Sequence, residues 1–196
     1  MTVPSASPAQ RAFPIACVVI SRDALAAAAG EAGGDSPCWA GEVERAESVR
    51  RVVDGAVHAG ASPIIAVLPA GVDVPPPARA ITSARGGSDL ALRIGIAQLA
   101  NTVVVGTLIW PIEEADISLE TALAVLDAAK RTNASIVVPG ASGVEGWPLY
   151  FARDGWRELL TTPGGVRAVL QQSRAAVDRI AVTTPVVAPN SAGRED

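Results

Sequence analysis

Short apolar segments rich in β-branched residues alternate with helix-like segments along this chain, and this alternation limits its fold more than any other feature. The predicted strands of this kind are 15–20, 63–68, 102–108 and 135–138. Strands that are apolar on both faces are typical of a parallel sheet covered by helices on both sides. The sequence therefore predicts an α/β fold, with a single three-layer αβα Rossmann-like domain and a mostly parallel sheet.

The helices between these strands have recognisable ends. Ser88 or Asp89 and then Ser118 are predicted N-cap residues, and Gly60 closes a long helix at 42–59. No repeat and no change in composition divides the chain. We expect a disordered arm at 1–14, one domain at 15–184 and a polar tail at 185–196. The remaining predicted elements are helices at 24–29, 88–99, 118–131, 155–160 and 166–174, and short strands at 80–82, 149–151 and 179–183.

The charge and hydropathy of the chain exclude several classes of function. The net charge is −4, and Lys130 is the only lysine, which argues against a protein that binds nucleic acid by broad phosphate neutralisation. No apolar run reaches the roughly 18 residues needed to span a bilayer. The first residues lack the basic cluster and apolar stretch of a signal peptide. We expect a cytoplasmic protein that binds neither nucleic acid nor membrane.

Cysteine and histidine, which bind soft metals and form catalytic pairs, are scarce in this chain. Cys17 lies in the first apolar strand and Cys38 in a loop, and two cysteines alone cannot hold zinc. His58 is the only histidine, and its place late in a helical pattern indicates a surface position. The sequence therefore predicts no metal site and no catalytic Ser-His or Cys-His pair.

Two glycine-rich turns, each next to an arginine, are candidate anion sites. Such a turn at a helix start leaves backbone N–H groups free to face phosphate, and arginine adds a bidentate charge. A tight turn before a helix explains Gly164 and Gly165 equally well, and both interpretations stay open here. The candidate nucleotide- or anion-binding residues are Arg85, Gly86, Gly87, Ser88, Arg93, Gly164, Gly165 and Arg167.

The order of several segments resembles the family of molybdenum-cofactor nucleotidyltransferases and related sugar-nucleotide pyrophosphorylases. The resemblance covers roughly 15–183 and depends on the order and spacing of its parts. The segments that carry it are Val52-Val53-Asp54-Gly55-Ala56-Val57-His58-Ala59-Gly60, Gly87-Ser88 to Arg93-Ile94-Gly95, Gly146-Trp147-Pro148-Leu149-Tyr150-Phe151, and Trp156-Arg157-Glu158-Leu159-Leu160 with Gly164-Gly165-Val166-Arg167-Ala168-Val169-Leu170.

This resemblance implies a three-layer nucleotide-binding domain that takes a nucleoside triphosphate with Mg²⁺, transfers a nucleotidyl group and releases pyrophosphate. In the family, a glycine-rich loop after the first strand supplies an arginine and a lysine for the triphosphate. One aspartate after the middle strand, in Asp-Gln-Pro or a similar turn, holds the metal. A second aspartate near the C-terminus completes the metal site.

The chain departs from the family pattern at each of these positions. The loop after the first strand has Arg22 as its one basic residue, and Ile109-Trp110-Pro111 stands where the first aspartate is expected. Trp147 replaces the histidine of the Gly-His-Pro segment, and 183–186 contains no second aspartate. We therefore expect Trp110 and Trp147 to mark degenerate active-site positions and to lie close together at the carboxyl end of the sheet.

Three hypotheses follow from these departures. The first is a nucleotidyltransferase-like protein that has lost catalysis, needs no cofactor and acts through a protein partner or self-association. The second is an active Mg²⁺-dependent nucleotidyltransferase acting on a molybdenum cofactor or a sugar phosphate, with acids recruited from Glu113, Glu114 or Asp116. The third is a binder of a nucleotide or another anion without turnover, using Arg85, Arg93 and Arg167. The fold alone does not choose among them.

Overall fold

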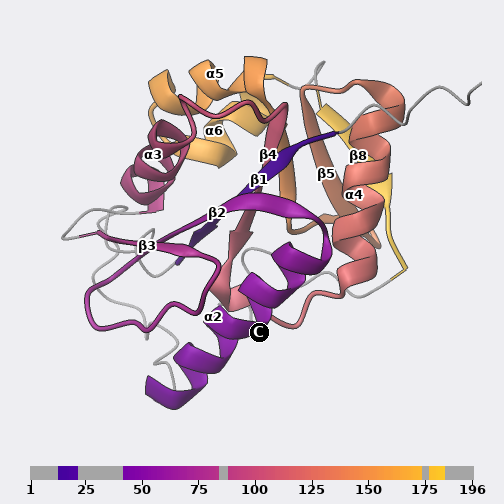
Figure 1. Cartoon of the computed structure of the whole chain (residues 1–196). Helices are drawn as coiled ribbons and strands as arrows, with labels where there is room; N and C mark the ends of the chain where they lie inside the picture. The colour runs from indigo at the N-terminus through magenta and orange to yellow at the C-terminus, as the bar shows by residue number, and fades with distance from the viewer. Residues whose placement is uncertain (1–12, 22–41, 84–87, 174–176, 184–196) are drawn as a thin grey trace, which may run out of the picture.

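The computed structural model of this chain describes residues 13–21, 42–83, 88–173 and 177–183, and Figure 1 shows how their helices surround a central sheet. The strands lie in the order β3-β2-β1-β4-β7-β5-β6, and β8 pairs with β5. In chain order the elements are β1 (Ile15–Ile20), α2 (Glu42–His58), β2 (Ala61–Leu68), β3 (Arg79–Thr82), α3 (Ser88–Gln98), β4 (Gly106–Pro111), η1 (Ile112–Glu114), α4 (Leu119–Thr132), β5 (Ile136–Ala141), β6 (Val144–Glu145), β7 (Leu149–Ala152), η2 (Arg153–Gly155), α5 (Trp156–Thr161), α6 (Gly165–Gln172) and β8 (Val177–Ala181).

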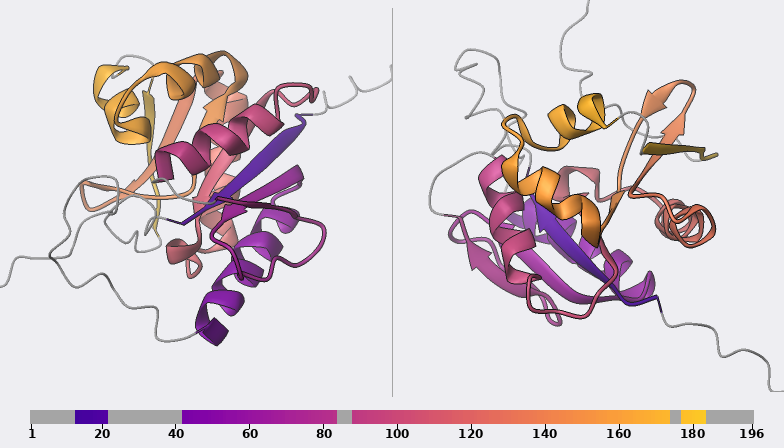
Figure 2. Two further views of the ribbon diagram at one scale, coloured as in Figure 1. Left: turned by 90° about the vertical axis from the view of Figure 1, so that its left-hand side faces the viewer. Right: turned by 90° about the horizontal axis from the view of Figure 1, so that it is seen from above.

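Most strands of the sheet are parallel, as predicted. β1 pairs in parallel with both β2 and β4, β2 with β3, and β5 with β8. β7 is antiparallel to its neighbours β4 and β5, so β4 and β5 run in the same direction. With helices on both faces of the sheet (Figure 2), the three-layer α/β fold class is confirmed.

The two faces of the sheet have separate hydrophobic cores, and β1 contributes to both. Its side chains alternate, so that Cys17 and Val19 pack under α2 and α4, while Val18 and Ile20 pack under α3, α5 and α6. Every residue of β1 is buried, as expected for a strand with a neighbour on each side and helices above and below. This strand is therefore in contact with both helical layers through the two cores.

The third predicted strand is wrong in its position. The β-branched run 103–105 indicated a strand at 102–108, whereas β4 begins at Gly106 and continues through Pro111. Val103 is 89% exposed, and its segment is a loop rather than part of the sheet. The Arg153 guanidinium holds this loop, because it donates to the carbonyls of Ala100, Thr102 and Val104.

Other predicted elements agree with the structure more closely. β1 occupies the range predicted for it, and the Ser118 hydroxyl accepts a hydrogen bond from the Thr121 backbone N–H at the start of α4. The predicted helix at 24–29 and the predicted tail at 185–196 lie outside the described residues. Of the predicted arm, the structure describes Phe13 and Pro14, and Phe13 stacks on Tyr150. No described helix is long and apolar enough to cross a membrane.

Tyr150, the only tyrosine of the chain, gives a direct test of this packing. Burial of the phenol, with a smaller effect of the negative charge of Asp154, raises the pKa of Tyr150 from 10.0 to about 12. Between pH 10 and about pH 12 the phenol is thus neutral in the folded chain. Its contribution to stability is complete below pH 10 and is lost as the pH rises towards 12. An absorbance titration near the phenolate band should show a single late transition. A transition near pH 10 in the folded chain would contradict the burial of the Tyr150 phenol.

Candidate functional site

The carboxyl ends of β1 and β4 lie side by side, and this is where ligands bind in open α/β sheets. Ile20 is in register with Pro111, the last residues of the two strands. The next residue after β1 is Ser21, and the next residues after β4 form the single turn η1. The sheet therefore brings Ser21 next to the acidic residues Glu113 and Glu114.

Glu113 and Ser21 are joined by a short hydrogen bond. The Ser21 hydroxyl donates to Glu113 Oε1 at 2.6 Å, a distance typical of a bond to an ionised carboxylate. Ser21 is buried and Glu113 is half-buried, while the neighbouring Glu114 is 2% exposed. A carboxyl group is rarely as enclosed as that of Glu114, and its neighbour Glu113 lies in the same turn, directly after β4.

Trp110 supports this acidic turn from inside the strand. Its ring is 1% exposed, and its indole Nε1–H donates to the Glu114 backbone carbonyl at 3.0 Å. The far edge of the ring faces Gly55 of α2, where an added Cβ would come within 3.0 Å of the ring atom Cη2. The absence of a side chain at Gly55 thus makes space for the indole ring.

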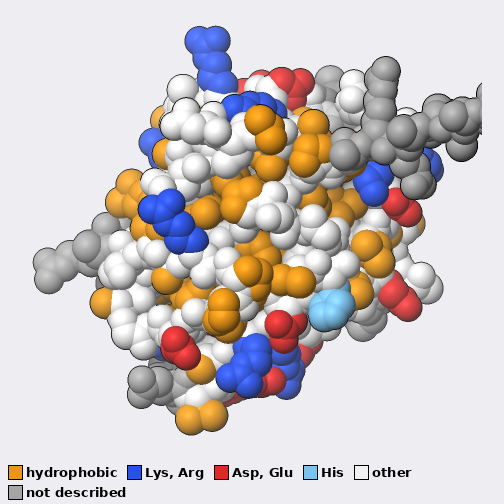
Figure 3. Space-filling view, viewed as in Figure 1, with side chains coloured by type: hydrophobic (Ala, Val, Ile, Leu, Met, Phe, Trp, Pro, Cys, Tyr) orange, Lys and Arg blue, Asp and Glu red, His pale blue; other side chains and the backbone are white. Residues whose placement is uncertain are grey.

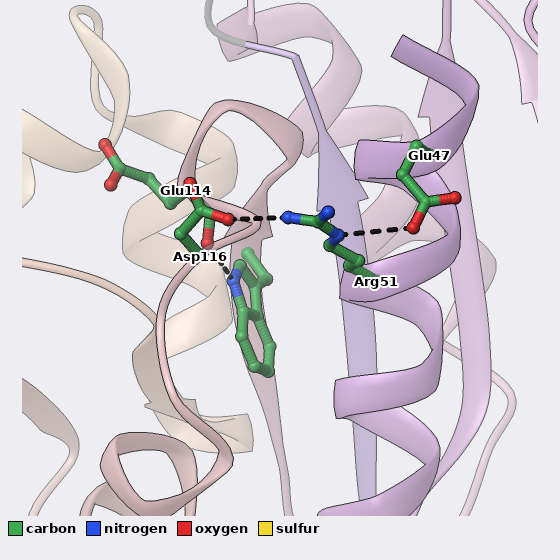
Figure 4. A network of polar contacts seen from close by, with 5 residues as sticks. Glu47, Arg51, Glu114 and Asp116 are labelled. Atoms are coloured by element: carbon green, nitrogen blue, oxygen red, sulfur yellow. Dashed lines mark hydrogen bonds and ion pairs between the residues drawn. The ribbon is translucent and has the colours of Figure 1, made fainter. Parts of the chain in front are cut away.

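Asp116, just beyond η1, has a different environment from the two glutamates. It is exposed and pairs with Arg51 of α2 at 2.8 Å, and Arg51 also contacts Glu47 one turn earlier at 3.3 Å. Figure 4 shows the Arg51 guanidinium between these two carboxylates. Of the three acids singled out in the sequence, Asp116 thus ties the turn to α2, whereas Glu113 and Glu114 lie at the strand ends.

The expected position of the strand end at Leu108 was wrong, and this changes which residues face the site. Residues Ile109, Trp110 and Pro111 belong to β4, where Ile109 and Trp110 point to opposite cores. The first residues beyond the strand are Ile112, Glu113 and Glu114. Residues 109–111, which include no acid, therefore belong to the strand. The turn that follows the strand does contain acidic residues, Glu113 and Glu114.

The prediction that Trp110 and Trp147 share one cleft is also wrong. Trp110 belongs to the core under α2 and α4, and Trp147 to the core under α3, α5 and α6. Both side chains are buried, Trp147 with 8% exposed. They are separated by the sheet because Trp110 lies in β4 with its ring facing α2, whereas Trp147 precedes β7 and packs on the other face. The two indoles cannot together fill one pocket.

The predicted anion-binding residues are only partly described. Arg85, Gly86 and Gly87 lie outside the described residues, as does the side chain of Ser88. Arg93 is half-buried and donates from Nη2 to the Thr162 carbonyl at 3.1 Å, which links α3 to the segment before α6. Arg167 is exposed on α6.

The turn before α6 lies against the first turn of α3. Gly164 and Gly165 have φ values of 88° and 59°, in the left-handed region that favours glycine. A methyl group at position 165 would collide with the carboxylate of Asp89. The structure thus places the turn beside the start of α3, with an acidic side chain against it.

Of the other candidate reactive groups, Cys38 lies outside the described residues, and Cys17 and His58 lie away from this site. Within the described ranges, no group of three or more His, Cys, Asp and Glu side chains could hold a metal ion by itself. Cys17 is fully buried, and desolvation raises the pKa of its thiol. His58 is exposed near the end of α2, as predicted. The face in Figure 3 carries scattered basic groups rather than one broad basic surface.

No family model matches this chain, and no curated protein sequence matches it. Its structure, in contrast, is similar to several solved ones. Rv0371c from Mycobacterium tuberculosis H37Rv superposes with a TM-score of 0.68 and 18% identity, covering 89% of this chain and 90% of the other. A second crystal structure of Rv0371c, solved as a complex with manganese, gives a TM-score of 0.60 and 19% identity, covering 87% and 89%.

Two further structures carry names that describe an activity. A nucleotidyl transferase from Methanothermobacter thermautotroptrophicus matches with a TM-score of 0.59 and 14% identity over 89% of each chain. The 2-C-methyl-D-erythritol 4-phosphate cytidylyltransferase from Thermus thermophilus matches with a TM-score of 0.58 and 13% identity, covering 90% and 93%. At these identities the likeness concerns the fold, and this chain has a nucleotidyltransferase-like fold.

Proposed function

We propose that this chain is a nucleotidyltransferase that takes a nucleoside triphosphate with a divalent cation, and that Glu113 is the carboxylate that holds the cation. The observation that carries the proposal is the 2.6 Å hydrogen bond from Ser21 to Glu113, formed where β1 and β4 end side by side. The likeness to a nucleotidyl transferase, a cytidylyltransferase and a protein solved with manganese supports it.

The groups at the strand ends suit a hard cation such as Mg²⁺ or Mn²⁺. Such cations prefer oxygen ligands, and Mg²⁺ is commonly held by one or two carboxylates together with substrate phosphates. Glu113 offers a carboxylate that Ser21 orients through one of its oxygens, and Glu114 is a second carboxyl group in the same turn. When bound, the cation would neutralise charge on the transferred phosphoryl group.

The chain's own residues would bind and orient the nucleotide around this turn. We propose that the segment 85–88, Arg93 and the turn 164–167 contact the nucleotide, as the resemblance to the family implies. Asp89, which packs against Gly165, would repel a phosphate and accept a hydrogen bond from an N–H or O–H group instead. We therefore expect the uncharged part of the nucleotide, rather than its phosphates, to lie beside Gly165.

Calorimetry of the full chain with CTP, GTP and ATP, each with and without Mg²⁺, tests the proposed function. We expect one of the three to bind, and its binding to require the cation because the buried carboxylates would otherwise repel the triphosphate. Pyrophosphate release with a phosphorylated acceptor would then identify the reaction. Failure of all three nucleotides to bind at millimolar concentration with Mg²⁺ would contradict the proposal.

A second candidate is the non-catalytic protein that acts through a partner or self-association. It is favoured by the sequence after β1, where Arg22 is the only basic residue between 21 and 41 and Asp23, Glu31 and Asp35 are acidic. Such a segment is poorly suited to a triphosphate. Under this alternative no nucleotide binds, and size-exclusion chromatography detects a complex. Nucleotide binding without the cation and without pyrophosphate release would instead identify a simple anion binder.

A further inference from the structure

Filling the hydrophobic core does not by itself explain why residue 110 is a tryptophan. It is the fifth residue of β4, and its ring lies between this strand and α2, against the backbone of Gly55. Its neighbours in this core are mostly aliphatic. A leucine or phenylalanine is also a large apolar side chain, but among such side chains only the indole of tryptophan brings an N–H donor to the end of the strand.

That donor is used on the acidic turn. Trp110 Nε1 donates to the Glu114 carbonyl at 3.0 Å, in a place where both groups are buried. η1 is a single turn of three residues, and its N-cap residue Pro111 contributes no side-chain hydrogen bond. So short a turn has little stability of its own. Its shape therefore depends on contacts from outside, and the indole supplies one at its last residue.

A second contact holds the same segment from the solvent side. Arg51 of α2 pairs with Asp116 at 2.8 Å, two residues after the carbonyl that Trp110 contacts. Both members of this pair are largely exposed, so the pair contributes less than the buried bond and weakens in salt. Figure 4 shows Arg51 reaching from α2 towards Asp116. Trp110 and Arg51 thus hold the turn from two sides.

We propose that Trp110 is a positioning residue for the metal-holding turn, and that its indole N–H keeps Glu113 directed at Ser21 and thereby sets the affinity of the site for a divalent cation. This inference rests on the proposed function. Loss of the N–H removes the indole donor from the buried Glu114 carbonyl and frees the turn to shift, so that Glu113 must be reordered whenever the cation binds. The cost of that reordering appears as weaker binding.

The variant that isolates the N–H is Trp110→Phe, because it keeps an aromatic ring in the core and removes the donor. Mn²⁺ alone is titrated into the full chain, and the free ion is measured by electron paramagnetic resonance. We expect Trp110→Phe to raise the Mn²⁺ dissociation constant by roughly three- to tenfold, the range that a net hydrogen bond represents. Arg51→Gln should raise it by less, and its effect should vanish in high salt.

Trp147→Phe is the matched control, because it makes the same change in a buried tryptophan on the opposite face of the sheet. It should leave the Mn²⁺ affinity unchanged. A second measurement needs no metal: amide hydrogen exchange in 112–116 should accelerate in Trp110→Phe and not in Trp147→Phe, with thermal melting showing that both variants are folded.

The outcomes separate the inference from the function on which it rests. A wild-type chain that binds no Mn²⁺ overturns the inference, whereas the proposed function is overturned by failure of the nucleotides to bind with Mg²⁺. Wild-type binding with an unchanged constant in Trp110→Phe overturns the positioning role and leaves the proposed function standing. An equal loss of affinity in Trp147→Phe also overturns the positioning role, because the effect would then follow general loosening of the core.

Discussion

Replacing Glu113 by glutamine is expected to lower the affinity of the chain for Mn²⁺ by at least about 100-fold. Residues that merely orient metal ligands contribute about 10- to 100-fold to metal affinity, and a carboxylate that contacts the cation should contribute more. Glutamine keeps the size of the side chain and an oxygen acceptor for the Ser21 hydroxyl, so the local structure should survive while the charge is lost. Metal titration and pyrophosphate release measure the two consequences.

Glu120→Gln is the matched control for this change. Glu120 is an exposed acid in the first turn of α4, so the variant removes the same charge a short distance along the chain without touching the strand ends. Its Mn²⁺ affinity should equal that of the wild type. Ser21→Ala, which removes only the donor to Glu113, should lie between the two. Equal affinities in Glu113→Gln and Glu120→Gln would show that Glu113 holds no cation.

Truncating Phe151 to alanine is expected to lower the free energy of unfolding by about 3–5 kcal/mol, the usual cost of emptying a buried aromatic position. Phe151 is 0% exposed and lies in β7, paired with both Thr107 of β4 and Ile136 of β5. Its ring belongs to the core under α3, α5 and α6. The cavity would therefore weaken the pairing of β7 with β4 and β5.

Denaturant unfolding followed by tryptophan fluorescence measures this loss, and Phe151→Leu should recover most of it because the cavity is smaller. Leu160→Ala is the control on the same side of the sheet, since Leu160 is 38% exposed and its truncation should cost less than about 1 kcal/mol. A Phe151→Ala variant as stable as the wild type would show that β7 does not join the sheet as described.

The fold could be predicted because its signals are local. The buried strand at Ile15–Ile20, the cap at Ser118 and the helix over Glu42–His58 each follow from nearby residues, and the structure confirms them. The error at the third strand arose because a contact distant in sequence overrode a local signal. The β-branched run 103–105 has high strand propensity, but the guanidinium of Arg153, distant in sequence, holds the preceding loop by its carbonyls.

The sequence by itself determined the layered α/β architecture, because apolar periodicity reports which faces are buried. Only the tertiary structure decided where β4 ends, and therefore that Glu113 rather than residues 109–111 faces Ser21. It also decided that Trp110 and Trp147 lie on opposite faces. The reason is that side chains in a strand alternate between faces, so an error of a few residues in the end of a strand changes which groups reach the site.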